Sequence, residues 1–440
     1  MLKTLRNAFK IKDIRKKILY TFMALIVVRI GSQLPIPGVN TEYFAQFFST
    51  RNSLSFFDAL TGGSFTTMSI FALGITPYIT SSIIMQLLTI AIPKLEEIQK
   101  DGEDGRKKIA EYTRYVTVAL AVIEALAMAI GFGNQGLLID GVTFSSVIIT
   151  VTTLTAGSAF LMWLGENITE KGVGNGISII LLINIVSRLP QDLVGLYEQF
   201  IANTTIAKAV VAAIIIAAVI AGMVVFIIIL QDGTRKIPVQ YAKKVQGRKM
   251  VGGQTSHIPL KVNTAGVIPV IFASSIMQFP IIIAQLLGKG NGNGIGSKIL
   301  KVLNQGAWCN FSSFGEFKYT LGLLIYIVLI IFFAYFYTSV TFNPIEVSNN
   351  MKKQGGFIPG IRPGRPTTDY LTKVLNNIIF IGAAGLTIVA IVPIFFSGAF
   401  GADVSFSGTS LIIIVGVVLE TMKQIESMML VRHYKGFLND

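Results

Sequence analysis

Long apolar runs recur along the whole chain and are separated by shorter polar segments. A helix needs about 20 mainly apolar residues to cross about 30 Å of hydrocarbon. Ten runs approach this length, and they cover residues 18–34, 65–92, 115–133, 144–165, 176–189, 207–230, 262–287, 319–341, 374–396 and 408–427. The pattern therefore predicts an all-α polytopic membrane protein with ten transmembrane helices. The run 65–92 is long and follows Thr61-Gly62-Gly63, so we expect its first part to be a broken or re-entrant segment.

Two of these runs carry related stretches of 13 residues that lie 192 positions apart. Residues 74–86 read GITPYITSSIIMQ and residues 266–278 read GVIPVIFASSIMQ, with seven identical positions. The first stretch lies in the second run and the other in the seventh, so the two cross the membrane in opposite directions. This is the pattern of an inverted-topology repeat. Chance similarity between apolar helices is the alternative, and the shared Gly, Pro and Gln make it the weaker one.

The composition supports the membrane class, and the charge distribution predicts the orientation. Hydrophobic residues make up 52% of the chain and charged residues 14%. The net charge is +14, and 29 of the 37 Lys and Arg residues lie in segments 1–17, 93–114, 231–261 and 342–373, in the C-terminal tail, or at Lys171 and Lys423. By the positive-inside rule this side is cytoplasmic, and both termini lie on it. Residues 1–17 are basic with apolar residues at helical spacing, which is typical of an amphipathic helix at the membrane interface.

Signals for catalysis or cofactor binding are missing from the sequence. No GxxxxGK[ST] nucleotide-binding loop occurs. His257 and His433 have no second ligand at metal-binding spacing, and the single cysteine, Cys309, has no partner for a disulfide. We therefore expect no metal, no cofactor and no enzymatic activity. Energy for any transport must come from a partner or from an ion gradient.

Three classes of function remain open at this point. An ion-coupled solute carrier with inverted repeats would need ionisable residues at mid-membrane depth, and the runs contain few: Arg29, Glu124 and Glu420. A purely structural subunit fits poorly with a repeat interrupted by Gly and Pro. A passive channel for a large substrate fits better, because the basic cytoplasmic segments 231–261 and 342–373 are long enough to contact a large acidic partner.

Several long blocks resemble the SecY family, whose members form the bacterial protein-conducting channel. These blocks begin with RIGSQLPIPG and continue with ALGITPY and MWLGENITEKGVGNGIS, and they cover residues 29–38, 72–78, 162–178, 259–269 and 343–364. The likeness extends over essentially the whole chain and is weakest in 288–318 and in the tail. It implies a clamshell of two inverted five-helix halves, 18–190 and 207–427, between a cytoplasmic amphipathic segment, 1–17, and a cytoplasmic tail, 428–440. It also implies a passive channel that passes unfolded secretory polypeptides and releases membrane segments through a lateral gate between helices 2–3 and 7–8.

The resemblance further implies roles for individual residues. An apolar pore ring would consist of Ile75, Ile79, Ile177, Leu181, Ile271 and Ile413. A plug at about 56–67 would include Phe56, Phe57, Asp58, Ala59, Leu60, Thr61, Gly62, Gly63, Ser64 and Phe65. Its two glycines would each weaken a helix by roughly 1 kcal/mol relative to alanine, so that the plug can leave its seat. Polar positions at the lateral gate would be Gln86, Glu124 and Asn263. From spacing alone, the pore-ring residues could equally be ordinary packing residues. The plug could equally be a surface loop, and the gate residues could be polar packing unrelated to gating.

Basic residues of the two long cytoplasmic loops match the positions at which the family docks a SecA motor ATPase or a ribosome. They are Arg235, Lys236, Arg248 and Lys249 in one loop and Arg362 and Arg365 in the other. Clusters of this kind suit ribosomal RNA phosphates, although basic loops beside a membrane also serve topology. The other partners implied are the small membrane subunits SecE and SecG, signal sequences, unfolded preproteins and the lipid bilayer. The implied location is the inner (plasma) membrane of a bacterium.

Overall fold

The computed structural model describes residues 2–41, 44, 58, 60–133, 136, 138–202, 206–241, 244–246, 249–251, 255–286, 295–304, 308–309, 320–400 and 408–436. Its first part is built from helices α1 (Leu2–Lys10), α2 (Lys12–Gly31), α5 (Thr76–Ala91), α6 (Pro93–Lys100), α7 (Glu103–Gly133), α8 (Phe144–Lys171) and α9 (Gly176–Tyr197), followed by a π-helical turn, η2 (Glu198–Ala202). The second part contains α10 (Ile206–Asp232), α11 (Ile268–Leu286), α12 (Ile295–Leu303), α13 (Leu321–Thr341), α14 (Pro344–Lys353), α15 (Arg365–Phe400) and α16 (Gly408–Gly436).

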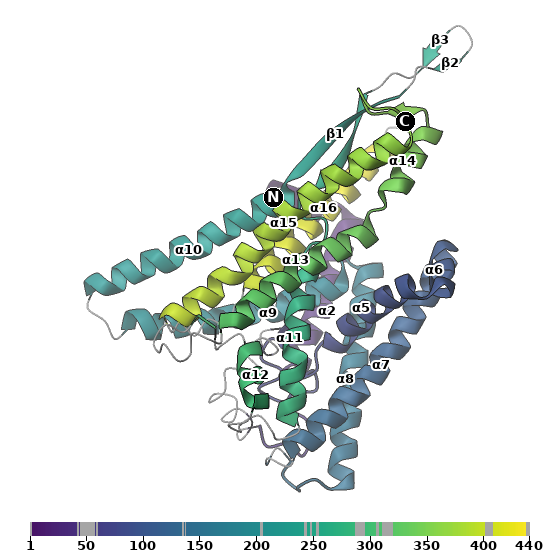
Figure 1. Ribbon diagram of the computed structural model, residues 1–440. Coiled ribbons are helices and arrows are strands. Elements are labelled where there is room, and N and C mark those ends of the chain that lie inside the picture. Colours follow the sequence, from purple (N-terminus) through teal and green to yellow (C-terminus); the bar gives the residue numbers. More distant parts are fainter. Residues whose placement is uncertain are drawn as a thin grey trace.

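Each of the ten predicted runs overlaps one helix: α2, α5, α7, α8, α9, α10, α11, α13, α15 and α16. Judged by length and apolarity alone, six helices in the described part of the chain can each cross a membrane. A seventh follows if α5 and α6, which are bent by 103° at their junction, are taken together. Figure 1 shows the strands and α14 at one end of the helical bundle and α12 at the other.

The predicted break in the second run is confirmed. Residues 62–75 form a series of turns, and the straight helix α5 begins only at Thr76. Three glycines in this segment, Gly62, Gly63 and Gly74, adopt φ values of +68°, +88° and +57°. Such values lie in the left-handed region, which glycine enters without steric cost. The helix predicted from residue 65 onward is therefore shorter than its apolar run.

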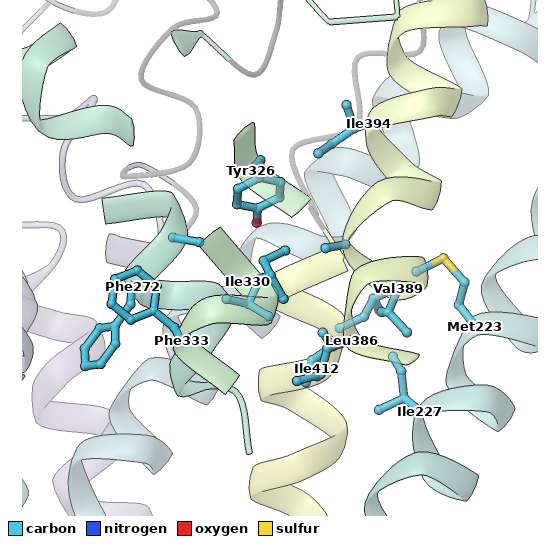
Figure 2. Close-up of a cluster of buried hydrophobic side chains, with 14 of the residues drawn as sticks. Met223, Ile227, Phe272, Tyr326, Ile330, Phe333, Leu386, Val389, Ile394 and Ile412 are labelled. Carbon is cyan, nitrogen blue, oxygen red and sulfur yellow. The ribbon is translucent and has the colours of Figure 1, made fainter. Parts of the chain in front are cut away.

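Two separate apolar cores lie in the two parts of the chain. The first contains buried residues only between Ile36 and Leu154, and the second only between Met223 and Val415. Figure 2 shows how side chains of α10, α11, α13, α15 and α16 converge in the second core. There Phe272 packs edge-on against Phe333, with 5.3 Å between ring centroids, and Ser274 Oγ lies 3.0 Å from Tyr326 Oη. These contacts join α11 to α13 as one packed unit.

A small sheet connects the two long basic loops, 231–261 and 342–373, whose paired strands lie about a hundred residues apart in the sequence. Strand β1 (Thr234–Tyr241) pairs antiparallel with β4 (Thr255–Lys261) on one side and with β5 (Gly356–Phe357) on the other. Strands β2 (Lys244–Gln246) and β3 (Lys249–Val251) extend the β1–β4 hairpin. Ile237 and Val239 point to the face of β1 that packs on Leu371 of α15, so a common core holds the loops together.

Candidate functional site

The repeated stretches have the same local geometry in both copies. Gly74 and Gly266 both adopt a positive φ, +57° and +64°, two residues before α5 and α11 begin. A proline follows as the second residue of each helix, where its missing N–H leaves no hydrogen bond unmade. Ile79 N donates to Ile75 O at 3.1 Å, and at the matching place Ile271 N donates to Val267 O at 3.2 Å. The repeat is therefore a structural one and not a chance likeness of apolar residues.

Six aliphatic side chains from both parts of the chain meet in a third apolar cluster. Three of them are buried and three are half-buried against the cluster; we call the set of six the collar: Ile75, Ile79, Ile177, Leu181, Ile271 and Ile413. They come from the start of α5, the start of α9, α11 and α16. Sequence reasoning predicted this set, and the structure brings its members together. None of the six carries a polar group.

A cavity of about 510 Å³ lies on one side of the collar. Ile79, Ile177 and Ile271 line it, as do Ile83 and Gln86 of α5. Opposite α5, the cavity is bounded by Ile268, Phe272 and Tyr337 of α11 and α13. The cavity thus lies between helices of the two halves, and its floor is apolar.

The polar rim of the cavity was not predicted. Arg114 Nε donates to Glu166 Oε1 at 2.9 Å and so ties α7 to α8. Glu170 follows Glu166 one helical turn later, and the Asn175 side chain accepts hydrogen bonds from Ile177 N and Ser178 N to cap α9. The capping residue could have been found, since Asn before a helix is a common start signal. The α7–α8 ion pair could not, because its partners are 52 positions apart.

The described part of the predicted plug lies at the collar and is in contact with α9. Leu60 belongs to the same apolar cluster as the collar, and Asn184 Nδ2 donates to Leu60 O at 3.3 Å. Phe56, Phe57 and Ala59 lie outside the described residues. The reason given above for the glycines was wrong: Gly62 and Gly63 do not weaken a helix but form turns with φ of +68° and +88°.

The three polar residues expected at the lateral gate are dispersed. Gln86 lines the cavity, whereas Glu124 lies on α7 and Asn263 precedes α11. Asn263 is buried and its Nδ2 donates to Gly266 O at 3.1 Å, so its bond is local to the turn. Among the described residues no hydrogen bond joins any two of the three. Their shared role therefore stays a prediction.

The basic residues of loops 231–261 and 342–373 lie on the small sheet and beside it. Arg235 and Lys236 are exposed on β1, and Arg362 and Arg365 are exposed just before and at the start of α15. Lys249 lies on β3, and Arg248 lies outside the described residues. Because β1 pairs with β5, the two loops form one surface and not two separate projections.

Comparisons with known proteins identify this arrangement. The SecY family model matches residues 69–422. The protein translocase subunit SecY of Halalkalibacterium halodurans is 45% identical over 445 residues, with 100% of both chains covered.

Two solved structures share the fold at 17% sequence identity, and each covers 94% of this chain and 92% of its own. One, with a TM-score of 0.65, is a SecY protein whose plug domain is described as stabilising the closed state of the translocation channel and maintaining a membrane seal. The other, with a TM-score of 0.63, is Sec61 in a canine ribosome–channel complex from the endoplasmic reticulum. With a family match over most of its length and a relative 45% identical from end to end, this multi-pass membrane protein belongs to the SecY family.

Proposed function

We propose that this chain is the channel-forming subunit of a bacterial protein translocase and passes unfolded polypeptides across the membrane. The observation that carries the proposal is the collar, in which six aliphatic side chains from both halves share one apolar cluster with Leu60 of the predicted plug, and three of the six line a cavity. A narrow apolar ring dewets, which imposes a large penalty on bare ions. A polypeptide brings its own apolar side chains and can cross the same ring. The collar is thus a seal that needs no charged filter.

In this proposal the cavity is the cytoplasmic vestibule, and the plug, 56–67, closes the outer side of the collar. The lateral gate is the seam between the wall made by α5 and α7 and the wall made by α11 and α13. Ser81 Oγ donates to Thr113 O at 2.7 Å within the first wall, and Ser274 with Tyr326 links the second. A hydrogen bond therefore joins the two helices of each wall. The cavity between them supports the seam as the place that opens toward lipid.

The driving energy comes from outside the chain. The exposed basic residues of the two loops suit an acidic surface of a SecA motor or the phosphates of ribosomal RNA. The chain itself contributes no chemical step and holds no cofactor. SecE and SecG are the expected small membrane subunits, and the expected location is the inner membrane of a bacterium with both termini cytoplasmic. The segregation of 29 of 37 basic residues to one side supports that orientation.

Export from reconstituted vesicles tests the proposed function. Vesicles that contain this chain with its small subunits should protect a radiolabelled preprotein from added protease when motor and ATP are supplied. Vesicles without the chain, or without ATP, should leave the preprotein fully digested. If protected preprotein does not exceed the level in chain-free vesicles, the chain is not a protein-conducting channel.

Reversing one charge at the docking surface should separate partner binding from folding. Arg362→Glu should reduce motor-driven export several-fold, because the guanidinium is exposed and faces the predicted partner. An exposed substitution of this kind changes the free energy of unfolding by only about 0.5 kcal/mol or less. Lys373→Glu, at another exposed position of the same loop region, is the matched control and should export normally. Loss of the Arg362→Glu protein from the membrane would instead assign Arg362 a structural role.

A further inference from the structure

A buried ion pair joins the plug to helix α9. Arg188 Nη1 of α9 is paired with Asp58 Oδ2, and the side chains are only 22% and 4% exposed. The other carboxylate oxygen, Asp58 Oδ1, accepts hydrogen bonds from Thr66 N at 3.0 Å and from Thr66 Oγ1 at 2.9 Å. One carboxylate therefore folds the segment 58–66 on itself and also ties that segment to α9.

The other hydrogen bonds between the plug and its surroundings are long. Arg29 Nη1 donates to Gly62 O at 3.4 Å, and the bond from Asn184 Nδ2 to Leu60 O is 3.3 Å long. Both lie at the long end of the range for hydrogen bonds. Gly62 sits directly on the α9 backbone: a Cβ added there would lie 2.8 Å from Asn184 O, with φ at +68°. The seat thus fits the plug tightly. Among the described polar contacts it holds the plug chiefly through Asp58 and Arg188, while Leu60 and Phe65 are buried in apolar clusters.

The seat also leaves polar atoms without partners. Within the described part of the chain, Ser64 Oγ, Asn184 Oδ1 and Arg188 Nε are buried and make no hydrogen bond. Buried polar atoms in this state cost free energy that hydration would recover. Leaving the seat is therefore favoured by these three groups and opposed by the ion pair. The apolar contacts of Leu60 and Phe65 also hold the plug. Among the polar groups of the seat, the ion pair is the one that opposes release.

We propose that the Asp58–Arg188 ion pair is the latch that keeps the plug seated, and that it sets how apolar a polypeptide segment must be to open the channel. The second half of this statement rests on the proposed function. A ligand shifts an equilibrium between closed and open states only by its preference for one of them. A signal segment opens the channel by binding the open state more tightly than the closed one. Weakening the latch reduces the difference in binding free energy that is needed, so less apolar segments will open the channel.

The first arm of the test measures the position of the plug without any transport. Ser64 is buried in the seated plug, so in a Cys309→Ala background a cysteine replacing Ser64 reports release through its reaction with a membrane-impermeant thiol reagent. Arg188→Met removes the charge but keeps a long apolar stem, and it should raise the labelling rate at least roughly tenfold, since losing one partner leaves the other charge buried alone. Arg188→Lys keeps the charge and should raise the rate less. Lys208→Met removes an exposed cation near the start of α10 and should leave the rate unchanged.

Asp58→Asn supplies an independent variant. Its amide oxygen can still accept from Thr66, whereas its charge is gone, so it should raise labelling as Arg188→Met does. The double variant should label no faster than the faster single variant, because coupled partners are non-additive. Gly62→Ala, whose methyl collides with α9, marks the rate of a plug that cannot seat. If both single variants label at the parental rate, or if their effects multiply, the latch is refuted.

The second arm measures the opening threshold. A series of preproteins with signal segments in which leucines are replaced stepwise by alanine is offered to vesicles with motor and ATP. Arg188→Met and Asp58→Asn channels should export members of the series that the parental channel rejects. An unchanged threshold together with faster labelling would remove the plug from control of opening. Failure of the parental channel to export any member would contradict the proposed function, while the labelling arm would still decide the latch.

Discussion

Ions should leak through resting channels once Ile79 and Ile271 are both replaced by asparagine. These residues occupy equivalent positions of the repeat, belong to one apolar cluster and line the same cavity. Two amides in the collar would offer hydrogen bonds to water and a carbonyl oxygen to a passing cation, neither of which the aliphatic side chains provide, so the dewetting barrier falls. Every ~1.4 kcal/mol removed from that barrier raises the ion flux about tenfold. Conductance of single channels in planar bilayers measures the leak.

The control for this experiment keeps the collar apolar. Ile79→Leu with Ile271→Leu preserves side-chain volume, and such swaps in a packed site usually cost less than about 1.5 kcal/mol. The leucine channel should stay as tight as the parental one, and both variants should still export a preprotein, because the collar grips no particular side chain. Equal conductance of asparagine and parental channels would remove these two residues from the constriction.

Joining α5 to α11 across the cavity should stop export, and releasing the bond should restore it. Ile83 and Phe272 both line the cavity, and Ile83 packs against the core that contains Phe272. Cysteines at these two positions can be oxidised if their Cα atoms lie within about 7 Å, or otherwise joined by a short bismaleimide. Cys309 is buried, so alanine is the better replacement for the background. Export of a preprotein by vesicles with motor and ATP is the readout.

A cross-link inside one wall is the matched control. Ser81 and Thr113 join α5 to α7, and cysteines there tie two helices that we expect to move together. That bond should leave export intact, and a long flexible cross-linker between positions 83 and 272 should also permit it. Full export through an efficiently formed short link between α5 and α11 would show that this seam does not open.

The elements that follow from local patterns were predictable, and contacts across long sequence separations were not. Gly74 and Gly266 indicate matching helix starts because a glycine with a proline three residues later is a local signal in the sequence. The positive φ of both glycines in the structure agrees with this. The family likeness located the collar, since its members fall inside long matching blocks. In contrast, nothing in the sequence indicates that Arg188 and Asp58, 130 positions apart, are partners. The pairing of β1 with β5 was missed because a strand of two residues has no periodicity to read.

Gly62 and Gly63 show how the reason expected for a residue can differ from the one that the structure gives. The two glycines were expected to be present because of their low helix propensity, which can be judged from the identity of a residue alone. The actual requirement at Gly62 is the close approach of two backbones, which depends on where α9 passes. Steric demands of this kind arise only once the tertiary structure is formed.

The three-stranded sheet has a mechanical consequence. Strand β1 leaves α10 after a single intervening residue, β4 leads into α11, and β5 lies between α14 and α15. The shared core beneath the sheet includes Met351 of α14 and Leu371 of α15. A force applied at either loop is therefore transmitted through the sheet and its core to the ends of α10, α11, α14 and α15 together. Under the proposed function, a partner that binds at either loop would therefore load the same four helix ends.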